Sequence, residues 1–243
     1  MKNHSLPAVL IGIILLLGLA VAARAEVTSD IAGSIVSFGR YEQDGNEENG
    51  PEPIEWIVLD VQDGKALLLS RYGLEHLPYH TADEKITWEG CTLRKWLNSD
   101  FLRTAFTSEE QDIIPETKVD NSSSQCFGRW NKAKGGNDTL DRVFLLSFAE
   151  ANRWLGVSWY GNGSDNAQME LTEYAGSDAH RRIPRSEEED GRTYWHWWLR
   201  SPGAEQADAS DVTTSGCLVT SGVTSDFPFV RPAIWLEFSG IGK

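Results

Sequence analysis

The stretches Trp197–Gly203 (WWLRSPG) and Val230–Leu236 (VRPAIWL) are the most informative parts of this chain for its fold. Each sets one arginine, Arg200 or Arg231, inside a bulky apolar run and follows it closely with a proline. A charge in such a run is costly to bury unless hydrogen bonds or a counter-charge compensate it. Two such blocks, about thirty residues apart, therefore predict a fold that closes its C-terminal end on an internal polar network.

The N-terminus has the pattern of an export signal. Lys2 precedes an apolar run over residues 6–22, and an A-x-A cleavage site ends at Ala25, so we expect cleavage there. The alternative is an anchor that stays in the membrane, for which a run of about seventeen residues is short. We expect a signal peptide over 1–25, a single domain over 26–243, a secreted or extracytoplasmic location, and no membrane insertion after cleavage.

The charge of the chain excludes one class of partner. Cleavage would leave 218 residues and would remove Lys2 and Arg24, which changes the net charge from −14 to −16. Such an acidic chain repels phosphate backbones and anionic membranes, so we expect no nucleic-acid partner.

Three cysteines remain after the signal: Cys91, Cys126 and Cys217. An odd number leaves at least one thiol unpaired within the chain. No C-x-x-C spacing is present, so neither a zinc knuckle nor a redox motif is predicted. If one disulfide forms, we expect it between Cys126 and Cys217.

Short strands and short helices alternate along the chain. Residues 31–72 have strand patterns with a hairpin turn at Asp63-Gly64, and strands return from Thr193 onward. Helical spacing and capping boxes, one of them at residues 108–111, predict short helices in the middle of the chain, over 91–114 and from Ser147 to about Gly156. The pattern favours an α+β fold in which the N-terminal and C-terminal strands share one sheet.

Several blocks occur in an order that resembles a family of uncharacterised domains from secreted and surface proteins, mostly of gut and soil bacteria. The blocks are IEWIVL (54–59), ALLLS (66–70), WEGCTLRKWLN (88–98), FLRTAF (101–106), VFLLSFAE (143–150), WWLRSPG and VRPAIWL. The resemblance covers about residues 31–238 and carries no settled activity. We expect structural roles for the following residues of these blocks: Arg94, Trp96, Arg200, Arg231 and Trp235.

The closing pattern is also similar, more distantly, to the C-type lectin-like fold of formylglycine-generating enzymes and of the variable proteins of diversity-generating retroelements. This resemblance implies short mixed or antiparallel sheets, a few short helices, and long loops between the late strands that carry the binding surface. The chain departs from it in two ways. It has no Trp-Asn-Asp triplet for a calcium-bridged sugar, and Cys217 has no partner cysteine near the final strands, which argues against oxidase activity.

We expect ligand contacts from two loops, 156–192 and 204–229. The second contains many small polar residues, which form an adaptable contact surface on a rigid frame. Aromatic side chains in Trp195–Trp198 would add stacking area if they are exposed. The alternatives are an ordinary solvated loop and tryptophans buried in the core. The candidate ligand-binding residues are Trp195, Trp198, Asp208, Ser210, Asp211, Thr213, Thr214, Ser221, Thr224 and Asp226.

We predict no catalytic residue, no metal and no cofactor. Pro78 interrupts any helix that would pair His76 with His80, and no G-x-S-x-G motif is present. The acidic loop from Asp44 to Glu55 resembles a calcium loop only weakly, because its glycine is misplaced and no helices flank it.

The expected function is therefore a non-catalytic recognition module for a glycan or a protein. The alternatives are an extracellular enzyme that acts on a polymer at an unrecognised site, and a variable display protein. Arg200 and Arg231 could bind an anion, but a structural role is favoured because both lie in apolar blocks. On that basis we expect Arg231→Ala to cost about 3 kcal/mol, as when a buried ion pair is broken.

Overall fold

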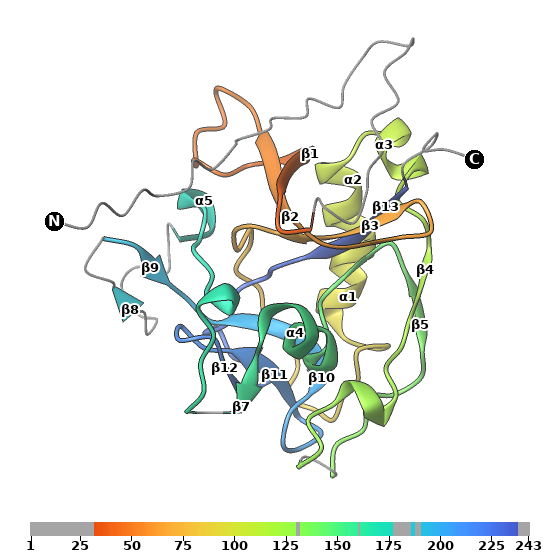
Figure 1. Cartoon of the computed structure of the whole chain (residues 1–243), viewed down its shortest axis with the longest axis vertical. Coiled ribbons are helices and arrows are strands. Elements are labelled where there is room, and N and C mark those ends of the chain that lie inside the picture. Colours follow the sequence, from red (N-terminus) through yellow and green to blue (C-terminus); the bar gives the residue numbers. More distant parts are fainter. Residues whose placement is uncertain (1–31, 130–131, 160, 177–185, 188–190, 238–243) are drawn as a thin grey trace, which may run out of the picture.

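The computed structural model describes residues 32–129, 132–159, 161–176, 186–187 and 191–237 (Figure 1). The expected signal peptide lies outside these residues. Among the residues described, no helix has the length and apolar character needed to cross a membrane.

A five-stranded antiparallel sheet brings the two ends of the described chain together (Figure 1). The expectation that early and late strands share a sheet is therefore confirmed. A hairpin turn with positive φ at Asp63 (51°) and Gly64 (75°) joins the second and third strands, as the Asp-Gly pair predicts. In spatial order the strands are β1 (Ile35–Tyr41), β2 (Glu52–Gln62), β3 (Lys65–Ser70), β13 (Ala233–Glu237) and β6 (Val143–Phe144).

A second sheet has four strands in the order β10 (Trp197–Pro202), β11 (Asp208–Val212), β12 (Cys217–Gly222) and β7 (Ser158–Trp159). The first three pair antiparallel, and β7 runs parallel to β12. The prediction of a loop through 204–229 is thus wrong for β11. Its small residues fit between two neighbouring strands, and Ala209, Ser210 and Asp211 are buried there.

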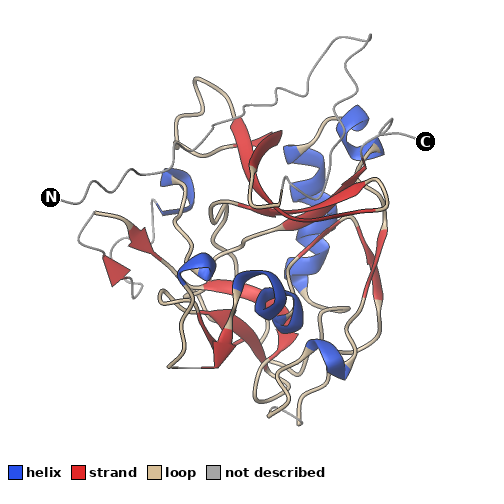
Figure 2. Ribbon diagram, viewed as in Figure 1, coloured by secondary structure: helices blue, strands red, loops and turns tan. Residues whose placement is uncertain are grey.

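Three consecutive helical segments form one continuous rod: α1 (Thr92–Trp96), a π-helical turn (Leu97–Phe101) and α2 (Leu102–Ala105). The rod packs beside the five-stranded sheet (Figure 2). The next helix, α3 (Ser108–Asp112), has its capping box one residue earlier than predicted. Thr107 rather than Ser108 is the N-cap, because Glu110 stands at the third helical position from Thr107 and exchanges hydrogen bonds with it.

The helix α4 (Phe148–Leu155) matches its prediction. Ser147 and Glu150 form its capping box, and Gly156 ends it in the left-handed conformation with φ 73°. Region 156–192, predicted without regular structure, contains several very short elements. The remaining elements are β4 (Thr117–Val119), β5 (Thr139–Asp141), β8 (Ser186–Glu187), β9 (Thr193–Tyr194), α5 (Glu173–Gly176) and 3₁₀ turns at Ser123–Gln125 and Asp165–Ala167.

One cluster of buried apolar side chains includes residues of both sheets, of the helical rod and of α4. The fold is therefore α+β, with antiparallel sheets and few short helices, as expected. All three cysteines are free, so Cys126 and Cys217, the pair favoured if one disulfide formed, are not bridged. Cys217 is buried on β12, whereas the Cys126 thiol points to the carbonyl of Ser122 in its own loop at 3.7 Å.

Candidate functional site

The Arg200 guanidinium is fully engaged. Its Nη atoms contact both carboxylate oxygens of Glu150, one of them at 3.0 Å. Its other bonds go to Asn121 Oδ1 at 3.2 Å, to the Leu145 carbonyl at 2.9 Å and to the Asp120 carbonyl at 3.0 Å. Because the side chain is buried and its charge is paired, this arginine ties α4 and the loop before β5 to β10.

The Arg231 guanidinium is equally buried but only partly engaged. Its Nε donates to the Ser70 carbonyl at 3.0 Å, and its Nη2 makes a long contact of 3.4 Å to the Arg71 carbonyl. One face lies over the ring of Trp197, with 5.0 Å to the centroid. Its Nη1 has no hydrogen-bond partner, and none of the carboxylates that the structure describes forms an ion pair with it.

This difference leaves a net charge inside the protein. Arg231 is 1% exposed. Burial lowers the pKa of its guanidinium to about 9. That value still lies above neutral pH, so Arg231 carries a positive charge without a counter-charge among the described groups.

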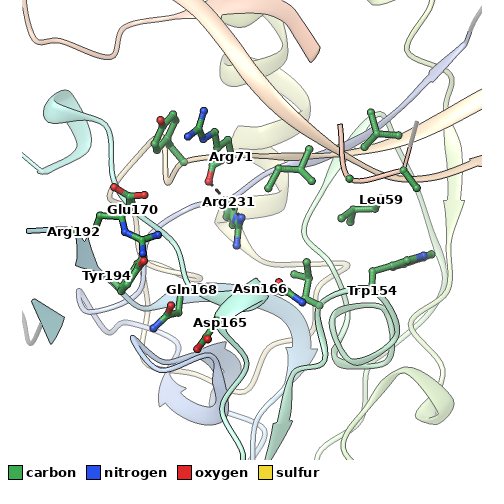
Figure 3. Close-up of a pocket in the computed structure, with 16 residues that line it drawn as sticks. Leu59, Arg71, Trp154, Asp165, Asn166, Gln168, Glu170, Arg192, Tyr194 and Arg231 are labelled. Atoms are coloured by element: carbon green, nitrogen blue, oxygen red, sulfur yellow. Dashed lines mark hydrogen bonds between the residues drawn. The ribbon is translucent and has the colours of Figure 1, made fainter. Parts of the chain in front are cut away.

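Arg231 lines a cleft of about 530 Å³ next to the 3₁₀ turn Asp165–Ala167. In Figure 3, Trp154 and Leu59 lie at one end of the cleft, Arg192 and Tyr194 lie at the other, and Arg231 lies between them. The lining combines aliphatic, aromatic, amide and charged groups: Ala32, Gly33, Ile57, Val58, Leu59, Arg71, Tyr72, Trp154, Leu155, Asp165, Asn166, Gln168, Glu170, Arg192, Tyr194 and Arg231.

Buried hydrogen bonds hold the polar side of this cleft. The indole of Trp197 donates to the Ala167 carbonyl at 2.9 Å, and the backbone amide of Gly73 donates to the Glu170 carbonyl at 2.9 Å. The segment 165–170 is therefore fixed at both ends to rigid parts of the fold. Preorganised polar groups of this kind reduce the entropy lost when a ligand binds.

The charges along the cleft are mixed, with an excess of cations. Three arginines and two carboxylates line it, although the chain as a whole carries −14. Arg71 pairs with Glu55 at 2.8 Å in a half-exposed position, and Arg192 lies over the ring of Tyr194 at 5.6 Å. The innermost cation, Arg231, is thus the charge that the described residues leave uncompensated.

None of the ten candidate ligand-binding residues lines this cleft. Trp195 and Trp198 are both buried, so neither presents an exposed ring; the indole of Trp198 donates to the Leu77 carbonyl at 3.0 Å. Ser210, Asp211 and Thr213 are also buried. Partial exposure remains at Asp208, Thr214 and Ser221, and full exposure at Thr224 and Asp226.

The two predicted loops nevertheless meet. Gln168 donates to the Thr214 carbonyl at 3.3 Å, and a Cβ added at Gly163 would lie 2.0 Å from the Ser215 carbonyl oxygen. This close approach requires glycine. The loop 156–192 therefore supplies lining residues of the cleft. The turn between β11 and β12 does not line the cleft but contacts that loop through Thr214 and Ser215.

Residues from outside the two predicted loops also line the cleft. Arg71 and Tyr72 follow β3, and Trp154 lies on α4. No motif marks these positions, because they become neighbours only when the two sheets pack. The isolated charge in VRPAIWL is the one sequence signal for this cleft, although its apolar neighbours favour a structural role.

The other predicted structural residues lie in or beside the core. Arg94 Nε pairs with the buried carboxylate of Asp141 at 2.7 Å, and Trp88 donates to the same carboxylate at 2.9 Å. Trp96 and Trp235 are partly buried against the core. The contacts of Arg94 and Trp88 with Asp141 hold the helical rod to β5.

A partly exposed histidine pairs with a buried acid outside the cleft. His196 Nδ1 lies 2.8 Å from Asp211 Oδ2, and Asp211 Oδ1 has no partner. Such a pair could orient a general base, but no serine, threonine or cysteine side chain among the described residues bonds to His196. The geometry therefore lacks a nucleophile in contact with the histidine.

The acidic residues of the calcium-like loop do not gather as a calcium loop would require. Asp44 gathers with Glu42 and Glu52, whose oxygens lie within 4.8 Å of one another, whereas Glu55 pairs with Arg71. Backbone and side-chain donors of the loop, including the amide of Asn46, already bond to these carboxylates. The cluster therefore forms the hydrogen-bonded frame of an exposed loop.

Comparison with known proteins identifies the family of this chain. No curated protein and no solved structure matches it. Residues 63–238, well over half of the chain, match the family described as "Domain of unknown function (DUF6273)", so the chain belongs to that family.

Proposed function

We propose that this protein is an exported, non-catalytic recognition module that binds one or two units of a glycan in the cleft beside Arg231. The observation that carries the proposal is the cleft itself. Its volume, about 530 Å³, lies within the range of small-ligand sites.

The lining chemistry supports a sugar ligand. Tyr72, Trp154 and Tyr194 contribute aromatic rings, on which the apolar face of a sugar ring can lie. Asn166 and Gln168 contribute amides, which both donate to and accept from hydroxyl groups. This mixture of flat apolar area and paired donors and acceptors suits a polyhydroxylated ring better than a purely apolar molecule.

The topology supports a C-type lectin-like fold as part of this proposal. The early strands β1–β3 and the last strand β13 share one sheet, and the late strands β10–β12 form a second. Residues 165–170, which precede those late strands, line the cleft. A fold of this type hosts several functions, so the proposal depends on the site rather than on the topology.

A glycan array tests the proposal. The purified exported protein is applied in the presence of calcium and, separately, of a chelator. We expect specific binding that survives chelation and that weakens in Tyr72→Ala and Asn166→Ala. Phe227→Ala, an exposed change in the 204–229 segment, is the matched control and should bind as wild type. Binding lost only in the Phe227 variant would place the site on that segment and would refute the cleft.

The same experiment also tests the alternative that the protein is an enzyme, because the bound oligosaccharides can be recovered and their length measured. Shortened products from a bound oligosaccharide would show turnover and would overturn the non-catalytic part of the proposal. We expect every bound oligosaccharide to be recovered intact after prolonged incubation.

A further inference from the structure

We infer that the ligand carries one carboxylate group, as in a uronic acid, and that Arg231 at the base of the cleft recognises it. This inference rests on the proposed function and specifies its ligand class. It is carried by the charge and geometry around one guanidinium.

Most of the Arg231 guanidinium is held in place by its surroundings, and the whole residue is 1% exposed. Carbonyl oxygens of Ser70 and Arg71 accept from Nε and Nη2, and the ring of Trp197 lies against one face. In Figure 3 the guanidinium lies among the lining residues, beneath the Arg71 carbonyl to which a dashed line joins it. Nη1 is the remaining donor group, and it has no partner.

An unpaired charge in this position favours an anionic ligand. A buried cation without a counter-charge destabilises the free protein, and an anion that enters the cleft removes part of that cost. Nη1 itself is buried and has no partner in the structure, so nothing among the described groups offsets its charge. The attraction is also stronger here than at the surface, because the effective dielectric constant is lower around buried groups.

The two carboxylates of the lining limit how much negative charge the ligand can carry. Asp165 and Glu170 lie in the same cleft as Arg71, Arg192 and Arg231. They can accept hydrogen bonds from sugar hydroxyls, but they repel a second or third negative charge. A carboxylate with a charge of −1 therefore fits the lining better than a phosphate dianion or a polysulfated sugar.

The fully paired Arg200 shows that the fold can neutralise an arginine where no ligand is needed. Glu150 sits at the third position of α4 and meets Arg200 with both oxygens. No described acidic residue takes the equivalent place beside Arg231. The block with Arg200 thus contains a buried ion pair, whereas the block with Arg231 contains a buried cation without a described counter-charge.

Calorimetric titration with matched sugar pairs tests this inference. The probes are di-galacturonate against the neutral galactose disaccharide, and glucuronate-containing against glucose disaccharides. We expect wild type to bind each acidic sugar at least tenfold more tightly than its neutral counterpart. Arg231→Met should remove the preference and retain weak binding of the neutral sugars. Arg231→Lys keeps a charge but not the fixed planar group, so its preference should be intermediate.

The control variant is Arg103→Met, which removes an exposed cation that does not line the cleft. It should keep most of the acidic preference, and a thermal melt of each variant checks that it folds. Equal binding of acidic and neutral sugars by wild type would overturn the inference and leave the proposed function intact. Binding of none of these sugars, or only of a peptide with a free carboxylate, would overturn both.

Discussion

The two arginine blocks have similar sequences, but only one of the two arginine charges is paired with a carboxylate. In WWLRSPG, Arg200 has bonds from its Nε and both Nη atoms and a carboxylate partner, Glu150. In VRPAIWL, Arg231 has two carbonyl partners, an aromatic ring and an Nη1 without a partner. Both side chains are buried to the same degree, 2% and 1% exposed. Burial alone therefore does not distinguish a structural arginine from a binding one; the counter-charge does.

The presence or absence of a counter-charge also indicates whether a buried arginine contributes to stability or to ligand binding. A paired buried charge is destabilising to break, whereas an unpaired one is destabilising to keep. Sites that bind ligands often retain such unfavourable groups because activity requires them. The two blocks thus allow a direct comparison between variants of the same residue type in one fold.

The largest effect is expected for Arg200→Met. This change leaves the Glu150 carboxylate without its cation and removes the donors to Asn121, Leu145 and Asp120. We expect a loss of about 3–5 kcal/mol in the free energy of unfolding, as for other broken buried pairs. Urea denaturation measures it, with Arg103→Met, whose side chain is 73% exposed, as the control that should change little. A loss below about 1 kcal/mol would refute the structural role of Arg200.

The next largest effect is expected on ligand affinity at high pH. The charge of Arg231 is present below its pKa of about 9 and is lost as the pH rises through that value. Affinity for an acidic sugar should therefore be constant up to about pH 8 and fall about tenfold per pH unit well above 9. The titratable and charged groups that line the same cleft are Arg71, Tyr72, Asp165, Glu170, Arg192 and Tyr194.

Neutral sugars provide the control for this pH profile. Burial raises the pKa of Tyr72 above its ordinary value, which keeps that phenol neutral over the same range. The unfolded chain holds the Arg231 proton up to a higher pH than the folded protein does. As the pH rises above 9, loss of this proton from the folded state therefore makes folding more favourable, not less. A parallel fall in the affinity for neutral sugars would therefore point to another group than Arg231.

Much of the fold could be predicted from local patterns. The Asp63-Gly64 turn, the Ser147 capping box and the Gly156 stop are short-range signals, and each forms as expected. Local patterns do not predict the strand β11, because its burial depends on neighbours on both sides. A sequence rich in small polar residues looks like a loop until β10 and β12 enclose it.

The candidate site could be predicted only in part. The unusual charge at Arg231 is visible in the sequence, and so is the long segment that contains residues 165–170. What the sequence cannot show is which arginine finds a carboxylate. That outcome depends on the three-dimensional position of Glu150, fifty residues before Arg200. The lining residues Tyr72 and Trp154 become neighbours for the same non-local reason.

A smaller effect is expected for Trp197→Phe. The phenyl ring keeps an aromatic face beneath Arg231 but loses the indole hydrogen bond to the Ala167 carbonyl. We expect a loss of about 1–3 kcal/mol, because a buried carbonyl is left without its donor. Since Ala167 lies in the segment that lines the cleft, ligand affinity should fall as well. Urea denaturation and titration with an acidic disaccharide on the same preparation measure both.

The matched control for that variant is Trp198→Phe. It loses an equivalent bond, to the Leu77 carbonyl, on the opposite side of the same strand and away from the cleft. Its stability should fall by a similar amount while its affinity stays at the wild-type value. If both variants lose affinity equally, the effect comes from general loosening of β10, and the anchoring role of Trp197 is wrong.

The smallest change in stability is expected for Arg231→Met. The loss of about 3 kcal/mol anticipated for Arg231→Ala assumed a buried ion pair, and no described carboxylate provides one. Methionine leaves the Ser70 and Arg71 carbonyls without these donors, at about 1–3 kcal/mol each as for Trp197→Phe, and loses the contact with Trp197, but it also removes an uncompensated charge. These terms oppose one another, so we expect a change within about 1 kcal/mol of wild type in urea denaturation. Acid-sugar binding should be lost in the same variant. A destabilisation as large as that of Arg200→Met would mean that Arg231 is a second structural arginine, and the contrast between the two blocks would disappear.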